Sequence, residues 1–285
     1  MTDEDLDKRV NPYRDDLAAA HLEGKVQAKR FTKGMKRQVV EAAVQLREAP
    51  RHDAVLETEL LLGEVVTVYD EHEGWSWVQA ETDSHVGYLS ANALTGAISR
   101  PTHRVRALRT HIYPEPDYKA PPLDLLSMNA RIELAGTEGR FAQLGDGRFV
   151  VASHCAPIDS FEEDFVEIAE RFLGTPYLWG GRTSIGLDCS AVVQLALQAT
   201  GAPCPRDSDM QETALGRPAS DPHDQGALRR GDLVFWSGHV GVMVDGARLL
   251  HANVHHMAVE IEPAAEAIAR IETAYGPITS VRRPS

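Results

Sequence analysis

Apolar and polar positions alternate in short runs between Gln38 and Leu94, in the segments VVTVYD, GWSWVQA and HVGYLS, which the turn-forming EHEG and ETDS separate. Alternation with a period of two, bounded by turn residues, predicts short half-buried strands. Residues 103–157 repeat this layout, and their Asp146-Gly147 pair is a strong hairpin signal. We therefore expect two successive small all-β barrels, over 36–100 and 101–158. Residues 1–35 are polar with a weak helical rhythm, and we expect an arm packed on the next domain.

The pattern changes after Ala156-Pro157. The segment SFEEDFVEIAERFLG has helical periodicity, with Ser160 as a plausible N-cap, Glu163 completing a capping box and Gly174 as the stop. A second apolar helix pattern runs over 189–200, and a β-rich stretch, GDLVFWSGHVGVMVDGARLLHANV, follows later. Residues 159–285 are thus predicted to form an α+β domain with helices first and an antiparallel sheet after.

Composition narrows the class of protein. The 285 residues carry a net charge of −13 without a cluster of lysine and arginine, which argues against nucleic acid and anionic membranes as partners and favours an amine-bearing ligand. No apolar run approaches the roughly 20 residues of a membrane span. The acidic N-terminus lacks an apolar core, so we expect no secretory signal. Three cysteines are too few for a disulfide framework, and a cytoplasmic location is expected.

One cysteine lies at the start of a predicted helix, where a reactive thiol is favoured. Cys189 opens the helix pattern 189–200, with Asp188 or Ser190 as its cap, and the glycine-rich segment YLWGG precedes it. Amides at a helix N-terminus and a neighbouring imidazolium lower the pKa of a cysteine. We therefore predict that Cys189 is a nucleophile held as a thiolate.

A thiolate nucleophile needs a base, and the hairpin after Gly231 supplies one in His239. A third group must orient the imidazole. A three-residue loop, 245–247, would place His239 opposite Asn253 with His251 one diagonal away on the same face, whereas a two-residue loop would turn His251 to the other face. Geometry alone leaves His251 and Asn253 open.

These residues resemble a known family. The segments PYLWGG…GLDCSAVV, RGDLVFWSGHVGVMV and LLHANV are similar to those of the NlpC-type cell-wall cysteine endopeptidases, which have a papain-like fold. The resemblance implies that Cys189 is the nucleophile, His239 the base and His251 the third catalytic residue. It also implies that Tyr177 donates to the oxyanion together with the Cys189 amide. The fold class expected is therefore multidomain, with two all-β barrels followed by an α+β papain-like cysteine peptidase domain.

The β-rich part extends the resemblance. LETELLLGEVV and GWSWVQ…HVGYL are similar to the bacterial SH3-like barrels that precede dipeptidyl-peptidase-VI-like enzymes, which cut free murein peptides between γ-D-glutamate and the diamino acid. In that branch the first barrel closes the groove, and acidic and polar groups hold the free amine of L-alanine. The resemblance assigns this substrate binding to Asp188, Ser190 and Ser208 on the catalytic side and to Glu64 and Tyr88 on the barrel side. No cofactor is implied.

Two other functions stay open. One is hydrolysis of intact peptidoglycan, with the SH3-like pair as wall anchors, and the other is an inactive domain that only binds murein peptides. The histidines of HANVHH, His251, His255 and His256, lack the spacing of a metal site, so no metal is expected. Cys155 and Cys204 are expected to be structural thiols.

Overall fold

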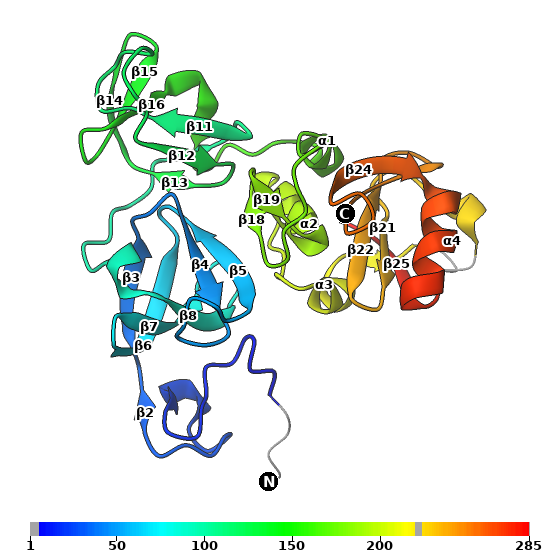
Figure 1. Cartoon of the computed structure of the whole chain (residues 1–285), viewed down its shortest axis with the longest axis horizontal. Coiled ribbons are helices and arrows are strands. Elements are labelled where there is room, and N and C mark those ends of the chain that lie inside the picture. The colour runs from blue at the N-terminus through cyan, green and yellow to red at the C-terminus, as the bar shows by residue number, and fades with distance from the viewer. Residues whose placement is uncertain (1–5, 220–223, 285) are drawn as a thin grey trace. The chain divides into compact units, whose positions relative to one another are not determined.

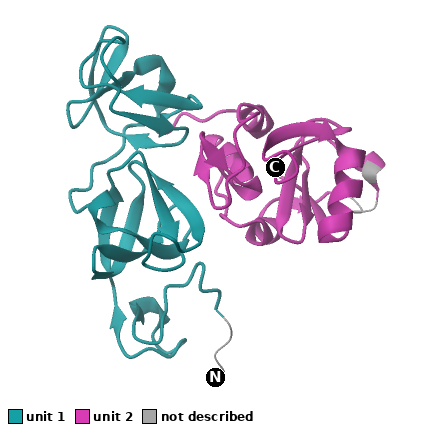
Figure 2. Ribbon diagram, viewed as in Figure 1, with its two compact units in different colours: residues 1–158 teal, residues 159–285 magenta. Residues whose placement is uncertain are grey.

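The computed structural model describes residues 6–219 and 224–284. The chain divides into two compact units, Met1–Ile158 and Asp159–Ser285 (Figure 2). The division falls directly after the second β-rich stretch of the sequence. Over the described residues, no helix has the length and apolar character needed to cross a bilayer.

The N-terminal arm packs on the first β-rich domain over its described residues. It holds a parallel pair of short strands, β1 (Ala18–Ala19) and β2 (Phe31–Thr32), and the 3-10 turn η1 (Ala20–Leu22). The amide of Val86 donates to the carbonyl of Arg9, at 2.7 Å, and the Gln79 side chain donates to the carbonyl of Val10, at 2.8 Å. The weak helical rhythm of this segment corresponds to that single 3-10 turn.

The first β-rich domain is a seven-stranded antiparallel sheet with the strand order β5-β4-β8-β7-β6-β3-β9 (Figure 1). Its alternating sequence buries one face, and the core includes Leu46, Leu60, Val66, Val78 and Leu89. The 3-10 turn η2 (Ala91–Ala93) precedes the last strand. The strands are β3 (Met35–Val39), β4 (Ala43–Arg47), β5 (Leu56–Leu61), β6 (Val65–His72), β7 (Trp75–Ala80), β8 (Val86–Ser90) and β9 (Leu94–Thr95).

The predicted turns account for the tight hairpins. His72 pairs with Trp75, so Glu73 and Gly74 form a two-residue loop in which both residues have positive φ, 49° and 80°. That conformation matches the twist of the flanking strands and favours glycine.

Residues 103–157 form a second group of short strands in three small sheets, β13-β10-β17, β11-β12 and β14-β15-β16. Asp146-Gly147 lies in the predicted hairpin, between β15 and β16, with φ of 90° at Gly147. The likeness of this group to an SH3 barrel stays a prediction. The strands are β10 (His103–Val105), β11 (Arg109–Ile112), β12 (Asp124–Ser127), β13 (Arg131–Ile132), β14 (Leu134–Glu138), β15 (Phe141–Leu144), β16 (Phe149–Val151) and, after the 3-10 turn η3 (Ala152–His154), β17 (Cys155–Pro157).

The second unit is α+β, with a six-stranded sheet of order β20-β25-β21-β22-β23-β24 (Figure 1). Its strands are β20 (Arg217–Pro218), β21 (Leu233–Trp236), β22 (His239–Met243), β23 (Arg248–Asn253), β24 (Ala258–Pro263) and β25 (Ser280–Arg283). The other elements are α1 (Phe165–Glu170), the β18 (Arg182–Thr183) and β19 (Gly186–Leu187) pair, α2 (Cys189–Ala199), α3 (Ser208–Ala214), η4 (Gln225–Ala227) and α4 (Ala264–Tyr275).

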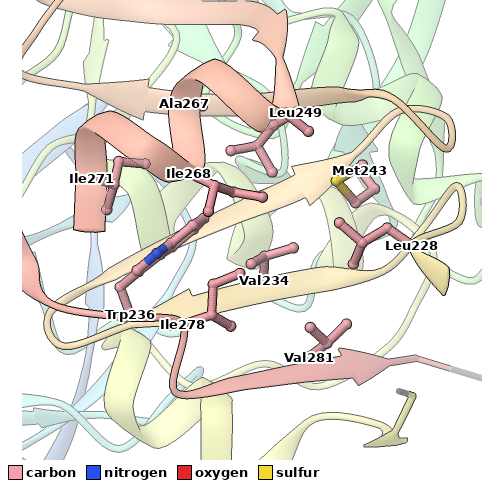
Figure 3. Close-up of a cluster of buried hydrophobic side chains, with 11 residues drawn as sticks. Leu228, Val234, Trp236, Met243, Leu249, Ala267, Ile268, Ile271, Ile278 and Val281 are labelled. Atoms are coloured by element: carbon pink, nitrogen blue, oxygen red, sulfur yellow. The ribbon is translucent and has the colours of Figure 1, made fainter. Parts of the chain in front are cut away.

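Helices cover both faces of this sheet. Ala267, Ile268 and Ile271 of α4 pack against one face, on a buried cluster that includes Trp236 and Met243 (Figure 3). Alternate residues of the same strands point the other way, toward the face that α2 contacts. Nearly every residue of α2 is buried, so this helix forms the centre of the unit.

The first predicted helix begins later than its sequence indicates. The N-cap of α1 is Asp164, whose carboxylate accepts from the amides of Val166 and Glu167, so the prediction of a helix start at Ser160 with Glu163 is wrong. The amide of Glu162 donates to the carbonyl of Ala199, at 3.0 Å. This bond fixes the segment after Ser160 to the end of α2, and the helix starts only beyond it.

The two oxygens of Asp164 have different partners. Oδ1 caps α1, whereas Oδ2 accepts from Arg230 at 2.7 Å, so the contributions of the cap and of the ion pair to stability can be measured separately. We expect Asp164→Ala to lower the free energy of unfolding of the second unit by about 1 kcal/mol. Asp164→Asn keeps a capping acceptor and loses only a solvent-screened pair, so it should cost less than about 1 kcal/mol. Urea denaturation with an unchanged m-value measures both, and equal losses would mean that the ion pair, not the cap, stabilises α1.

Candidate active site

Cys189 is the first residue of α2, and its side chain sits at the end of the central helix. Asp188 is the N-cap, with Oδ1 accepting from the amide of Ala191 at 2.9 Å, so the cap is Asp188 rather than Ser190. Cys189 is only 8% exposed. The helix therefore places a buried thiol beside the first amides of α2, which have no partner within the helix, and negative charge is favoured there.

The glycine-rich approach folds tightly on itself. β18 pairs with β19, and a Cβ on Gly181 would lie 2.6 Å from the carbonyl oxygen of Gly186. Gly180 has φ of 72°, and its amide donates to Oδ2 of Asp188 at 3.0 Å. These glycines are required because the loop packs closely against itself and against the helix cap.

The register of the hairpin brings two histidines together. Met243 pairs with Leu249 and the amide of Val244 donates to the carbonyl of Arg248, so the loop is the three-residue one, 245–247. Nε2 of His239 and Nδ1 of His251 lie 2.8 Å apart.

Asn253 serves the turn that follows. Its Oδ1 accepts from the amide of His256 at 2.8 Å, and its side-chain amide donates to the carbonyl of His251. The structure therefore brings His251, rather than Asn253, to the imidazole of His239.

The contacts continue beyond His251 to residues that the sequence pattern did not indicate. Nε2 of His251 lies 2.7 Å from Oε1 of Glu262, and the Arg270 guanidinium donates to both oxygens of that carboxylate. Glu262 lies on β24 and Arg270 on α4. The signal that could have found Glu262 is the next hairpin, since β24 pairs with β23 and places its acidic residues across from His251.

Burial sets the protonation of the reactive groups. It raises the pKa of the Cys189 thiol to about 12, with the Asp188 charge adding to the rise and the amides of Val240 and Ser190 opposing it. Burial also lowers the pKa of His239 to about 3, helped by His251 and Arg270. The resting pair is thus a neutral thiol and a neutral imidazole. The expectation of a standing thiolate is corrected, because the cost of removing both charges from water exceeds the stabilisation by the helix amides.

Aromatic rings hold His239 on two sides. The Tyr275 ring stacks on the imidazole, with centroids 6.2 Å apart and an angle of 19° between planes, and Trp236 lies 5.7 Å away. Tyr275 is the last residue of α4, far from the hairpin in sequence, and no local pattern marked it.

The hydroxyl of Tyr177 lies close enough to Cys189 to interact with it electrostatically. Burial raises the pKa of its hydroxyl, and the neighbouring Cys189 and Asp188 side chains raise it further. The phenol therefore keeps its proton and remains a hydrogen-bond donor beside the nucleophile.

Asp188 caps the helix and also forms a buried ion pair. Arg206, buried at 2% exposure, donates to Oδ1 at 2.9 Å and to Oδ2 at 2.7 Å. Amides of Gly180 and Ala191 take the remaining directions. The carboxylate is thus paired with Arg206 in the structure, and substrate binding by Asp188 stays a prediction. Arg206, in the segment PRDSDMQ, is a residue that the sequence reasoning missed.

The two predicted serines differ in their surroundings. Ser190 is buried, and its hydroxyl donates to Oδ1 of Asp188 and accepts from Arg206 at 2.8 Å. Ser208 opens α3 and is half-buried. Substrate binding by either serine stays a prediction.

In the first unit, the structure separates Glu64 from Tyr88. Glu64 is 2% exposed, and its carboxylate accepts from the amide of Leu61 and from the hydroxyl of Thr82, both at 3.0 Å. These two contacts close a turn of the seven-stranded sheet. Substrate binding by Glu64 stays a prediction.

Tyr88 lies on β8 of the seven-stranded sheet. It lines a cavity of about 590 Å³ together with Trp77, Glu48 and Glu57. Its hydroxyl accepts from Arg14, at 3.0 Å. The carboxylates that share the cavity with Tyr88 are thus those of Glu48 and Glu57, along with acidic residues of the arm.

The other cysteines and histidines have structural surroundings. The Cys155 thiol donates to the carbonyl of Val151, and burial raises its pKa to about 11, while Cys204 is buried in its loop. His255 and His256 pack edge to face in the turn before β24. Within residues 6–219 and 224–284, no group of three or more His, Cys, Asp or Glu side chains is arranged to hold a metal ion.

The chain is similar to known proteins in both units. Residues 174–274 match the NlpC/P60 family, and residues 46–94 match the bacterial dipeptidyl-peptidase Sh3 domain. A gamma-D-glutamyl-L-lysine dipeptidyl-peptidase of Bacillus subtilis is 27% identical over 240 residues, which cover 76% of this chain and 78% of the relative. The protein of the same name from Bacillus cereus is 27% identical over 241 residues, covering 73% and 70%.

A crystal structure of an NlpC/P60 family protein from Bacillus cereus has the same fold. It aligns with a TM-score of 0.71 at 22% identity, over 87% of this chain and 99% of its own. These matches define a class of protein, a peptidase-family domain preceded by a bacterial SH3 domain. The second unit carries an NlpC/P60 domain, as the sequence motifs indicated, and the first carries a bacterial dipeptidyl-peptidase Sh3 domain.

The neutral thiol makes a prediction about its reactivity. Because its pKa is raised, the thiolate fraction of Cys189 is small at neutral pH, and we expect alkylation by iodoacetamide to accelerate steadily from about pH 6 to about pH 9. Mass spectrometry of the Cys189 peptide measures the rate. Cys155 in the same digest is the internal reference, because burial raises its pKa as well. A rate that levels off below about pH 7 would show a standing thiolate–imidazolium pair instead.

Proposed function

We propose that this protein is a cysteine peptidase whose nucleophile is Cys189. The observation that carries the proposal is a buried thiol at the start of the central helix in an NlpC/P60 domain that also holds a hydrogen-bonded imidazole pair, His239 and His251. A nucleophile, a base and a group that orients the base make up the arrangement that acyl transfer needs.

The proton movements follow from the neutral resting state. The contact to His251 uses Nε2 of His239, so Nδ1 is the nitrogen that takes the thiol proton as the sulfur attacks the carbonyl carbon. The tetrahedral intermediate collapses when the same imidazole gives that proton to the leaving amine. Water then hydrolyses the thioester, with His239 as the base, and the thiol is restored.

The developing oxyanion has two candidate donors. The amide of Cys189 is among the first amides of α2, which have no partner within the helix. Tyr177 is the second, because its raised pKa keeps the hydroxyl protonated. Both donors act most strongly in a site from which water is excluded.

The substrate class comes from the relatives. Two are named gamma-D-glutamyl-L-lysine dipeptidyl-peptidases, and a dipeptidyl-peptidase removes dipeptides from a free N-terminus. We infer that this protein cuts the γ-D-glutamyl–diamino acid bond of free murein peptides that begin with an unblocked L-Ala. The net charge of −13 agrees with an amine-bearing substrate. Recycling of such peptides would take place in the cytoplasm, which is the location we propose.

A second candidate function is hydrolysis of intact peptidoglycan. A relative of the second unit alone, from Haemophilus influenzae, is named a probable endopeptidase NlpC homolog and is 33% identical over 95 residues, and an endopeptidase need not require a free N-terminus. Digestion of purified sacculi separates the two functions, since release of stem peptides from the polymer without cleavage of free tripeptide would favour the wall hydrolase. A module that only binds murein peptides would cleave neither.

The nucleophile is tested by substitution. We expect Cys189→Ala to lower kcat by at least about 1,000-fold, because covalent catalysis is lost whereas the helix and its cap remain. Release of the diamino acid from L-Ala-γ-D-Glu-L-Lys measures the rate, with Cys204→Ala as the control for loss of a buried thiol. Parental activity in Cys189→Ala would remove the peptidase assignment.

Amine recognition is tested on the substrate. We expect N-acetylation of the L-Ala-γ-D-Glu-L-Lys tripeptide to lower kcat/KM by about 10- to 1,000-fold, because an acylated amine carries no charge to pair and adds bulk. The same comparison with meso-diaminopimelate in place of lysine gives the diamino acid preference. Equal rates for the free and acetylated peptides would remove the free-peptide claim and leave the nucleophile unaffected.

A further inference from the structure

Four side chains continue the reactive pair into the domain in a single hydrogen-bonded series. His239 on β22 contacts His251 on β23 at 2.8 Å, and His251 contacts Glu262 on β24 at 2.7 Å. Arg270 on α4 then donates to Glu262, with Nη1 2.8 Å from Oε2. Each contact joins a different pair of elements, so the series crosses the sheet and ends at the helix that covers it.

The donor and the acceptor of each hydrogen bond in this series follow from the ionisation of Glu262, which lies at the end away from His239. Burial, the imidazole and the guanidinium act together on Glu262, and the net result lowers its pKa to about 2. An ionised carboxylate accepts hydrogen bonds and donates none, so Nε2 of His251 must carry a proton. Burial lowers the pKa of His251, which makes it a neutral ring with one proton. Its Nδ1 is therefore an acceptor.

The same reasoning gives the tautomer of the base, His239. Because Nδ1 of His251 accepts, Nε2 of His239 must donate, and the single proton of that neutral ring lies on Nε2. The lone pair of His239 is then on Nδ1, the nitrogen that the mechanism uses. The reverse tautomer would leave two lone pairs facing each other across 2.8 Å in a buried place, which is unfavourable.

We propose that Glu262, held by Arg270, is a positioning residue that acts through His251 to keep the proton of His239 on Nε2, so that Nδ1 is ready to take the proton of Cys189. Glu262 touches neither substrate nor sulfur in this role. The inference rests on the proposed function for its catalytic consequence, whereas the tautomer itself is a property of the unliganded protein.

Further titratable groups lie around the series. His256, in the turn before β24, has Nδ1 3.9 Å from Oε1 of Glu262. Tyr275 and Trp236 flank His239 as rings. Glu262 is thus the anion next to the paired imidazoles, and its side chain is 11% exposed.

The structure supplies a matched control on the same strand. Glu260 is the residue directly across from His251 in the strand register, yet the ring of His251 bonds Glu262 instead. Glu260→Gln and Glu262→Gln therefore make the same chemical change two residues apart on one strand. Glu262→Asp keeps the carboxylate on a shorter side chain, and a purely structural role would not require that charge.

The first measurement concerns the tautomer in the full-length parent, with histidine labelled with ¹⁵N and the spectra of His239→Ala and His251→Ala used for assignment. We expect Nε2 protonated and Nδ1 unprotonated in both rings near neutral pH. A proton on Nδ1 of either ring would overturn the proposal, whether or not any variant folds. A parent with the expected tautomers but no peptidase activity would contradict the proposed function alone.

The second measurement concerns rate. We expect Glu262→Gln to lower kcat on the tripeptide by about 10- to 100-fold with KM little changed, because one buried hydrogen bond of the series loses its fixed direction. Its His239 resonances should show a mixture of tautomers. Glu262→Asp should recover most of the loss, and Glu260→Gln should match the parent. Equal kcat values and equal imidazole spectra for Glu262→Gln and Glu260→Gln would refute the proposal.

Discussion

The hydrogen bond between His239 and His251 depends on the register of one hairpin. A three-residue loop sets that register, and Oδ1 of Asp245 accepts from the amides of Ala247 and Arg248, both at 2.8 Å, which fixes the loop. One residue fewer would turn the ring of His251 to the opposite face of the sheet. The position of the base relative to the helix N-terminus depends on the same ladder, since the amide of Val240, next to His239, is the one that faces the cysteine.

Burial is the second constraint, and the domain divides its charges accordingly. The reactive thiol and imidazole are 8% and 9% exposed, and both are neutral at rest. The charges around them lie in compensated pairs, buried Asp188 with Arg206 and part-buried Glu262 with Arg270. An unpaired buried charge would cost several kcal/mol, whereas a paired and hydrogen-bonded one costs much less. Fixed charges therefore surround the site while the groups that change protonation stay uncharged.

The helix of Cys189 and the hairpin of His239 could be predicted because their signals are local, a cap before an apolar periodicity and a turn between alternating strands. Arg206, Glu262 and Tyr275 could not, because each meets the site across 11 to 36 residues of sequence, at a point fixed only by the packing of separate elements. The turn contact of Glu64 is likewise not evident from sequence, since its carboxylate is seen to accept from the amide of Leu61 only in the structure. Gly241, on the same strand as His239, makes room for Leu249, which a Cβ would approach to 2.8 Å.

Because Cys189 and His239 are neutral at rest, the protein must control which nitrogen of His239 carries the proton. When a thiolate stands ready, the orientation of the base matters chiefly for the leaving group, but here proton removal is part of the attack, so the tautomer of His239 decides whether a base is present at all. A carboxylate alone could set that tautomer only at the risk of charging His251, because an unpaired anion raises the pKa of the imidazole it contacts. A doubly protonated His251 would donate from Nδ1 and reverse its bond to His239. The guanidinium of Arg270 offsets the charge of Glu262 while leaving its lone pairs in place, so the carboxylate orients the series without protonating it.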